Sequence, residues 1–234
     1  MDPSLRHERY PHETTSSQST FDSITLCDPL DVCVVDFNTR KVIKVIPRSR
    51  ENKAVASLLR HGRSTKYAES GWASRDRDPD ILNGETWTNR ALLFAEALGV
   101  RLPPDARRDQ GVPGKFYASH AEMQLIVYLI SRVFSIPRYV GDVEGVREKL
   151  EARKAKLQRS GTKLAWIKAN MYPSPPCFEL ANALMEYGVE LQLQGPDPRR
   201  LMLANGEGEV DQSTSTSYGD NTLELESRFS VVIL

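Results

Sequence analysis

The sequence predicts an α/β domain with a mixed sheet that carries helices on both faces. In the second half of the chain, apolar residues at helical spacing alternate with short β-branched runs. Because helices and strands follow one another in this order, crossover connections should lay the helices against a sheet. With 234 residues and 40% hydrophobic content, the chain can bury one sizeable core without disulfides or metals to support it.

The first half of the domain combines strands and helices. Two β-branched runs, 31–37 and 40–46, are typical of a hairpin with a short turn. Segments 51–60 and 86–98 each carry apolar residues three or four positions apart, which predicts two amphipathic helices. Gly99 ends the second of these helices, and the proline- and arginine-rich stretch after it predicts a loop over 101–114.

The second half contains the most core-like helix that the sequence predicts. Residues 119–133 are dense in aliphatic side chains, and Ser119 suits the N-cap of a largely buried helix. Residues 145–160 alternate positive and negative charges, which predicts a solvent-facing helix inside a charged insertion near 141–160. The remaining elements are expected to be a strand at 163–168, a helix at 178–187 and a strand at 189–194.

The domain is expected to occupy residues 23–204. Residues 1–22 are polar and rich in Ser and Thr, which predicts a disordered leader. The C-terminal 205–234 should be loose, with an edge strand or an apolar strip at 229–234. No signal peptide and no membrane-length apolar run is seen, so we expect an intracellular protein of the cytoplasm or nucleus, without membrane partners.

Charge and cysteine usage narrow the classes of function further. Lys and Arg total 31 and Asp and Glu total 31, so any contact with a polyanion has to be local. Cys27, Cys33 and Cys177 form an odd set without the spacing of a secreted disulfide framework, which favours a reducing compartment. Homo-oligomerisation is compatible with the sequence, but no surface patch predicts it.

Two short motifs carry the chemistry. His120-Ala-Glu122 begins the buried helix, and Pro175-Pro-Cys177 follows a strand and begins the next helix. Hydrolytic deamination needs an activated water and a group that moves protons, and zinc with a carboxylate supplies both. Helix N-termini favour thiolates and anionic oxygen, because their free N–H groups and positive dipole end point at the site.

With these motifs the chain resembles the cytidine/nucleotide deaminase superfamily, and in particular its fungal nucleic acid/nucleotide deaminase branch. In that branch a run ending in His-Ala-Glu-x-Gln-Leu precedes Pro-Pro-Cys-x-x-Cys. Here the first run reads Gly114-Lys-Phe-Tyr-Ala-Ser-His-Ala-Glu-Met-Gln-Leu125. The resemblance implies a three-layer cytidine-deaminase-like fold and a Zn²⁺ cofactor.

The resemblance also assigns roles to residues. Carried over by position, His120 and Cys177 are zinc ligands and Glu122 is the catalytic proton carrier. The second zinc cysteine of the family falls on Leu180, which cannot bind a metal. Glu179 or a loop side chain offers an oxygen instead, but nothing in the sequence selects one. Catalytic zinc sites usually have three protein ligands and a water, so the third ligand stays open.

Two hypotheses about function follow from this incomplete ligand set. The first is a zinc-dependent hydrolytic deaminase that acts on a nucleobase in a nucleotide or a single-stranded nucleic acid. The alternative is a catalytically inactive protein of the deaminase fold that acts as a binding or regulatory partner. A third hypothesis makes Cys177 a thiol nucleophile with His120 as its base. Each motif residue also has a structural interpretation, with His120 as a helix cap and Cys177 as a core thiol.

Basic and aromatic residues flank the motifs and are candidates for contacts with a substrate. The basic residues Arg101, Arg107, Arg108 and Lys115 suit phosphate groups, and a solvated loop explains them equally well. The aromatic residues Phe116, Tyr117, Tyr172 and Phe178 suit stacking on a base, and core packing explains them equally well.

Overall fold

The computed structural model describes residues 23–28, 30–36, 39, 41–60, 63–73, 78–159 and 163–196. Two units divide the chain, 1–196 and 197–234, and every described residue belongs to the first unit. The leader expected at 1–22 and the tail expected at 205–234 therefore lie outside the described residues.

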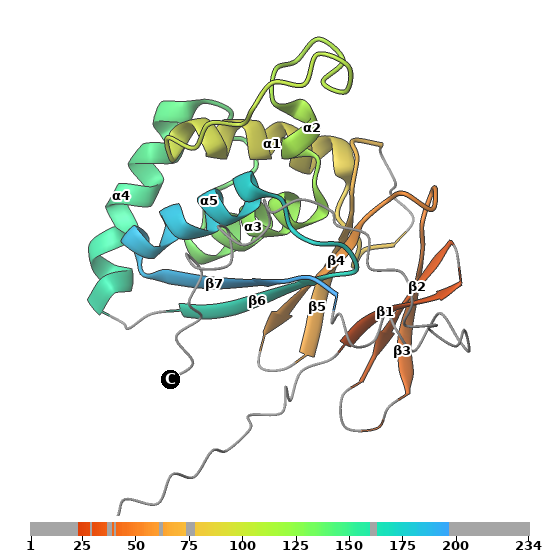
Figure 1. Cartoon of the computed structure of the whole chain (residues 1–234). Helices are drawn as coiled ribbons and strands as arrows, with labels where there is room; N and C mark the ends of the chain where they lie inside the picture. The colour runs from red at the N-terminus through yellow and green to blue at the C-terminus, as the bar shows by residue number, and fades with distance from the viewer. Residues whose placement is uncertain are drawn as a thin grey trace, which may run out of the picture. The chain divides into compact units, whose positions relative to one another are not determined.

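Two sheets form the β structure of the described part of the chain (Figure 1). The smaller one is antiparallel and consists of β1 (Ser23–Asp28), β2 (Asp31–Val35) and β3 (Val42–Pro47), so the hairpin expected from 31–46 is confirmed. The larger sheet has the order β5-β4-β6-β7, with antiparallel pairs except for the parallel pair β6–β7. Its strands are β4 (Val55–Arg60), β5 (Arg63–Glu69), β6 (Lys163–Ala169) and β7 (Val189–Gln194). The predicted α/β class with a mixed sheet is confirmed.

Segment 51–60 was expected to be helical, and this expectation is wrong. Residues 55–60 form β4, which pairs with β5 on one side and β6 on the other. Ala56 and Leu58 pack into the main core, whereas Val55 packs into a second cluster with the small sheet. A strand that is buried on both faces has a short, nearly continuous run of apolar residues. Such a run also contains apolar residues three and four positions apart, as an amphipathic helix does.

Helices cover one face of the larger sheet in layers, as Figure 1 shows. Helix α3 (Ala121–Val133) packs on β4, β5 and β6, and α5 (Pro175–Ala183) packs on β7. Helix α1 (Gly84–Ala97) packs against α3, and α4 (Val143–Arg159) packs against α1. The short elements α2 (Lys115–Ala118) and η1 (Leu184–Tyr187) precede α3 and follow α5. This layering is compatible with a deaminase-like α/β arrangement. The described helices lie on one face of the larger sheet and the small sheet covers the other face, whereas the sequence predicted helices on both faces.

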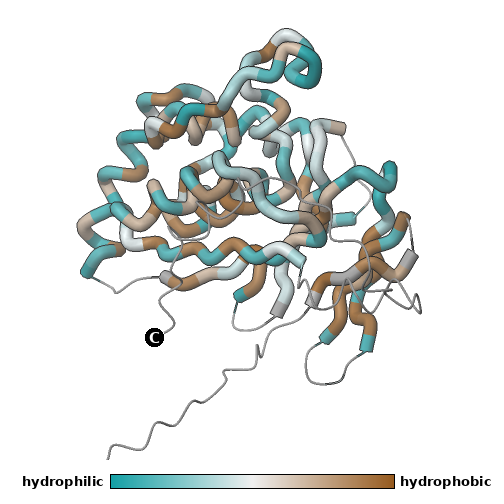
Figure 2. Tube along the Cα trace, in the orientation of Figure 1, coloured by the Kyte–Doolittle hydropathy of each residue, from teal (hydrophilic) through white to brown (hydrophobic). Residues whose placement is uncertain are grey.

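The core lies between α3 and the sheet. Ten residues of α3 are buried, and Figure 2 shows α3 as one of the more hydrophobic helices. Helix α4 is largely hydrophilic in the same view, and it buries only Val146 and Leu150. The solvent-facing helix expected in the charged insertion is therefore confirmed. On the opposite face of the sheet, Val32, Val34 and Ile46 of the small sheet pack against Val55 and Tyr67.

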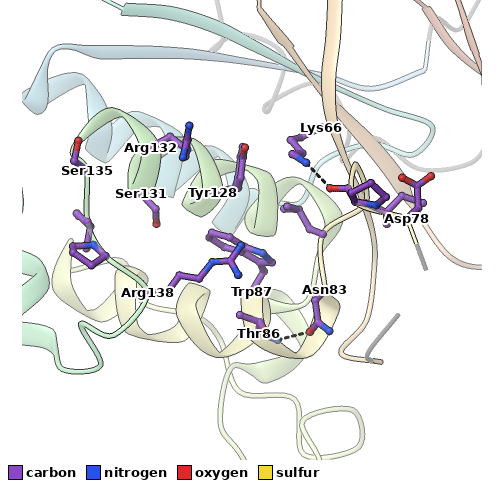
Figure 3. A pocket seen from close by; sticks show the side chains of 15 residues that line it. Lys66, Asp78, Asn83, Thr86, Trp87, Tyr128, Ser131, Arg132, Ser135 and Arg138 are labelled. Carbon is purple, nitrogen blue, oxygen red and sulfur yellow. Dashed lines mark hydrogen bonds between the residues drawn. The ribbon is translucent and has the colours of Figure 1, made fainter. Parts of the chain in front are cut away.

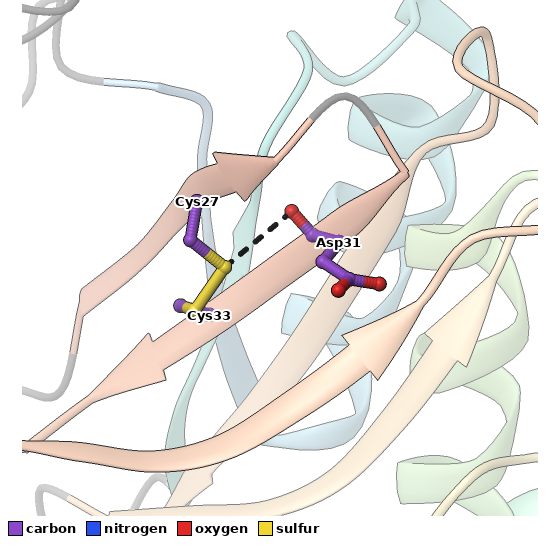
Figure 4. The surroundings of a disulfide bond; sticks show 3 residues. All are labelled: Cys27, Asp31 and Cys33. Carbon is purple, nitrogen blue, oxygen red and sulfur yellow. Dashed lines mark hydrogen bonds between the residues drawn. A yellow bond between two sulfur atoms is a disulfide. The ribbon is translucent and has the colours of Figure 1, made fainter.

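The small sheet carries a disulfide that the sequence did not predict. Cys27 of β1 and Cys33 of β2 are bonded, with their Cα atoms 5.8 Å apart (Figure 4). This bond was not anticipated, because the cysteine spacing favoured a reducing compartment. The two cysteines are six residues apart in the sequence, and the antiparallel pairing of β1 with β2 brings their side chains within bonding distance. The spacing of cysteines along the chain does not predict this pairing. Within the described residues, Cys177 is the remaining thiol and is buried.

None of the helices in the described ranges combines the length and the apolar character that a membrane crossing requires.

Candidate active site

His120 lies at the junction between α2 and α3. It is the N-cap residue of α3, with extended backbone angles of φ −63° and ψ 142°. This corrects the expectation that Ser119 caps the helix, because the Ser119 hydroxyl instead donates to the carbonyl of Phe116. The imidazole of His120 makes no capping hydrogen bond. Its ring packs edge-on against Phe116, with 5.0 Å between ring centroids, and is therefore fixed in direction.

Cys177 lies in the first turn of α5, opposite the start of α3. Pro175 and Pro176 occupy the first helical positions, where a missing N–H costs nothing and the fixed φ suits a helix. The N-cap residue of α5 is Ser174, and its carbonyl accepts a hydrogen bond from the backbone N–H of Cys177. The local sequence thus directs the sulfur of Cys177 toward the start of α3.

The two helix starts bring an imidazole, a carboxylate and a thiol together. Potential ligand atoms of His120, Glu122 and Cys177 all lie within 4.8 Å of one another. The Sγ atom of Cys177 is 3.9 Å from Nδ1 of His120. The hydroxyl of Ser174 lies 3.0 Å from the same Nδ1 and 3.4 Å from Sγ, so it touches both groups. Sequence reasoning overlooked Ser174, although it directly precedes the Pro-Pro-Cys motif.

Burial governs the protonation of this group of three residues. Burial lowers the pKa of His120 to about 4, and the positive charge of Arg108 contributes to this shift. Burial raises the pKa of Glu122 to about 7. Burial, followed by the negative charge of Glu122, raises the pKa of Cys177 to about 12, although Ser174 and backbone N–H groups oppose the shift. The environment therefore favours the uncharged forms, and a bound cation would reverse this preference for the carboxylate and thiol.

A pocket of about 460 Å³ opens onto His120 and Glu122. Its walls come from loops at the ends of β4, β5 and β6 and from the loop before α2. Cys177 lies behind the pocket and has no exposed surface. Complete burial argues against the hypothesis that Cys177 is a nucleophile, because a substrate carbon would have no access to its sulfur.

Cations and aromatic rings line the same pocket. Arg107, Arg108 and Phe116 are among the lining residues, as is Tyr172, which is 66% exposed. Four of the sequence candidates are not in the lining: Arg101, Lys115, Tyr117 and Phe178.

Two further lining residues, Trp72 and Lys53, were missed by sequence reasoning. Lys115 lies with its amine 4.8 Å from the Trp72 ring centroid, and Arg108 lies 4.5 Å from that of Phe116. The pocket therefore combines flat rings with positive charge.

Gln124 holds the pocket wall in place. Its buried side-chain amide donates to the backbone carbonyls of Glu69, Gly71 and Ser119, which ties α3 to the loop after β5. The same loop approaches α1 closely, since a Cβ at Gly84 would lie 2.6 Å from the carbonyl oxygen of Gly71. Gln124 lies two residues after the His-Ala-Glu motif, but spacing alone does not indicate that its side chain holds the pocket wall.

The donor set is able to hold a metal ion. Imidazole nitrogen, thiolate sulfur and carboxylate oxygen are all zinc ligands, and three protein ligands with one open position are usual in catalytic zinc sites. Leu180 lies one helical turn after Cys177 and is fully buried, so this position offers no donor. If Glu122 is kept free for proton transfer, His120 and Cys177 remain as ligands beside the hydroxyl of Ser174.

The mixed α/β fold is compatible with a deaminase-like fold, and the group of three donors is able to hold a metal ion. Residues 67–126 match the family model described as single-strand DNA deaminase toxin A, C-terminal. This match supports a nucleic-acid deaminase-like family. It covers the end of β5, α1, α2 and the start of α3, and so includes His120 and Glu122 but not Cys177.

Two wider comparisons gave no further relatives. No curated protein and no solved structure matched the chain.

Proposed function

We propose that this protein is a zinc-dependent hydrolytic deaminase that acts on an amino-bearing base in single-stranded nucleic acid. The observation that carries the proposal is the convergence of His120, Glu122 and Cys177 within 4.8 Å, beside a pocket of about 460 Å³. The match of residues 67–126 to a single-strand DNA deaminase family supports the choice of substrate. Deaminases of this kind act on single strands or extrude the target base from the stack.

In the proposed reaction, water replaces the exocyclic amine of the base. Oxygen adds to the ring carbon that bears the amine, the carbon–nitrogen bond breaks, and ammonia leaves. Glu122 accepts one proton from the water and passes it to the ring nitrogen. It then carries the second proton from the added oxygen to the departing amine, so that ammonia leaves and a carbonyl forms. A carboxyl whose pKa is raised by burial to about 7 suits both accepting and donating a proton near neutral pH.

His120 and Cys177 are the proposed ligands for zinc. When bound, zinc supplies a water whose pKa is lowered to near neutrality. The lowered pKa of His120 keeps its imidazole uncharged and able to bind a metal. Ser174 touches both ligands and orients them, as hydrogen-bonding partners of metal ligands commonly do.

The rim of the pocket is the proposed contact surface for the strand. Trp72, Phe116 and Tyr172 offer ring faces on which neighbouring bases can stack. Arg107, Arg108 and Lys53 line the same pocket and suit phosphate oxygens. Although the chain carries no net charge, these cations are concentrated where a strand would have to lie.

Glu122→Gln tests the proposed catalytic role. The substitution keeps the size of the side chain and removes its ability to take up a proton, so turnover should fall at least about 100-fold with the fold intact. The assay follows the mass of short oligodeoxynucleotides that carry one cytosine or one adenine, because replacing an amine by oxygen changes the mass. Circular dichroism checks the fold of the variant.

Glu148→Gln on the exposed face of α4 is the matched control and should retain activity. Conversion by Glu122→Gln at the wild-type rate would reject the assignment of Glu122.

A second candidate function rests on Leu180. Because this buried residue offers no metal ligand, the chain also suits a deaminase-fold protein that binds single-stranded nucleic acid without converting it. Tight binding of an oligonucleotide, combined with no mass change in the presence of added zinc, would favour this second function over the first.

A further inference from the structure

A second pocket, of about 710 Å³, lies between α1, α3 and the segment that follows α3 (Figure 3). We call it the arginine pocket. Its lining includes Trp87, Tyr128, Ser131, Arg132 and Arg138, with Lys66 of β5 at another side. None of these residues has a part in the candidate active site described above.

Two arginines line this pocket, and a third is buried next to it. Arg132 and Arg138 are exposed lining residues, and neither has a carboxylate partner among the described residues. Arg90 lies behind them and is 6% exposed. It donates to the Ser131 hydroxyl at 3.3 Å and to the backbone carbonyl of Arg138 at 3.0 Å.

The buried guanidinium of Arg90 is incompletely satisfied. Its Nε has no hydrogen-bond partner within the described ranges. Burial, with a contribution from the charge of Arg138, lowers the pKa of Arg90. Burying a cation without a counter-charge is costly, so an anion bound at the arginine pocket would relieve this cost.

The acidic residues nearby do not neutralise these arginines. Asp78 is a lining residue, but it pairs with Lys44 at 2.9 Å. Asp80 pairs with Lys44 at 3.0 Å and with Lys66 at 3.7 Å. Within the described ranges, Asp78 and Asp80 are thus paired with lysines, and Arg132 and Arg138 have no carboxylate partner.

A small cavity shares lining residues with both the arginine pocket and the active-site pocket. This cavity of about 40 Å³ shares Lys53, Ser70 and Gly71 with the active-site pocket, and shares Ile81 and Leu82 with the arginine pocket. The two pockets also lie along the same helix, because His120 caps α3 and Arg132 lies in its last turn.

The length of α3 sets the spacing between the pockets. Twelve residues separate His120 from Arg132, which is about 18 Å along the helix axis. At about 3.4 Å per stacked nucleotide this distance corresponds to roughly five nucleotides.

We propose that the arginine pocket binds phosphate groups of the same single strand whose base enters the candidate active site, several nucleotides away from that base. This inference rests on the proposed function for its choice of ligand. It adds a second point of attachment that fixes the direction of the strand along α3.

Oligonucleotide length distinguishes this second attachment point from the first. Binding of fluorescently labelled trimer and dodecamer oligodeoxynucleotides is measured by anisotropy over a series of salt concentrations. The double variant Arg132→Gln/Arg138→Gln should bind the dodecamer more weakly. It should also reduce the slope of log K against log salt by about 1.4, or about 0.7 for each phosphate that the variant no longer neutralises. Binding of the trimer should not change, because it cannot reach both pockets.

Arg153→Gln/Lys156→Gln removes two exposed cations from α4 and is the matched control, since the change in net charge is the same. An equal effect of the control would contradict the inference, because it would reflect net charge alone. If the double variant weakens binding of the trimer as much as binding of the dodecamer, the pocket binds a short free ligand, and the inference is contradicted. Failure of the wild type to bind the dodecamer would also contradict the inference.

Measuring deamination on the same samples separates the two proposals. Length-dependent loss of binding without any deamination would support the arginine pocket and reject the proposed function. If the wild type deaminates the oligonucleotide and Arg132→Gln/Arg138→Gln binds the dodecamer as tightly as the wild type, the proposed function is supported and the arginine pocket is rejected.

Discussion

Leu180 is the residue that most affects the proposed chemistry. It lies three positions after Cys177, so both side chains are on the same face of α5. Leu180 is fully buried in the main core beside Cys177. A thiol at this position would be the third protein ligand that catalytic zinc sites usually have. At the proposed zinc site, Leu180 therefore supplies apolar packing in place of a ligand.

Leu180→Cys is expected to bind zinc at least about tenfold more tightly than the wild type. A direct metal ligand should affect zinc affinity at least as much as a residue that only hydrogen-bonds to a ligand. Without metal, the smaller side chain should lower the free energy of unfolding by about 2 kcal/mol. Competition with a chromogenic chelator measures the affinity, and urea denaturation with and without zinc measures the stability.

Leu184→Cys is the control for this change, because Leu184 is also a fully buried leucine but lies beyond the end of α5. It should lose stability without gaining zinc affinity. The same gain in zinc affinity in both variants would show that the added thiol acts away from the proposed site.

At the level of elements, Asp109 organises the loop that carries Arg107 and Arg108 to the pocket. Its carboxylate accepts three backbone hydrogen bonds, from Asp105, Gly114 and Phe116, at 2.7 to 2.8 Å. Burial opposes the charge of Asp109, but these three N–H donors outweigh it and hold the pKa below its ordinary value. The loop and the start of α2 are thus fixed around one carboxylate.

Asp109→Asn is expected to lower the free energy of unfolding by about 1–3 kcal/mol at pH 7, because one acceptor oxygen becomes an amide that faces N–H donors. Because the pKa of Asp109 is lower in the folded state, its ionised carboxylate stabilises the fold at pH values above its pKa in the unfolded chain, about 3.9. This stabilisation is lost as the pH falls through the pKa of the folded state. The gap between wild type and variant should therefore be widest above about pH 5 and should narrow below it.

Urea denaturation at a series of pH values measures this gap, with Asp142→Asn at the start of α4 as an exposed control. A gap that grows toward acid pH would refute the role given to Asp109.

The elements differ in how well the sequence predicts them. Helices α1 and α3 are long enough for apolar periodicity to be decisive, and both occur where they were expected. Strand β4 was mistaken for a helix, because five of its six residues are buried and their side chains show no alternation of apolar and polar residues. The pairing of β1 with β2, and with it the Cys27–Cys33 bond, depends on strand register and cannot be read from spacing.

In the candidate site, the sequence predicted the residues that lie at helix starts but not the residues whose role depends on tertiary contacts. His120, Glu122 and Cys177 were found because helix starts carry a local signature, and the structure brings them together. Ser174, Gln124 and Trp72 were missed, since their importance comes from contacts that form only when α3, α5 and the loop after β5 meet. Such contacts are tertiary and leave no periodic trace in the sequence.

At the scale of the whole molecule, charge is distributed unevenly although its sum is zero. Equal numbers of basic and acidic residues make the chain neutral overall. Arg107 and Arg108 nevertheless gather at one pocket and Arg132 and Arg138 at the other, without carboxylates to match Arg132 and Arg138 in the described part of the chain. Binding of a single strand should therefore depend on these surfaces and not on long-range attraction by net charge.

The central claim is that two helix starts form one metal site, and the zinc content of the purified protein tests it most directly. Elemental analysis of wild type, His120→Ala and Cys177→Ala, after dialysis against zinc and removal of the excess, should give about one zinc per wild-type chain. Both variants should lose it while keeping their circular dichroism spectra. A wild-type protein that stays free of zinc, or one whose zinc is unaffected by either substitution, would contradict the account.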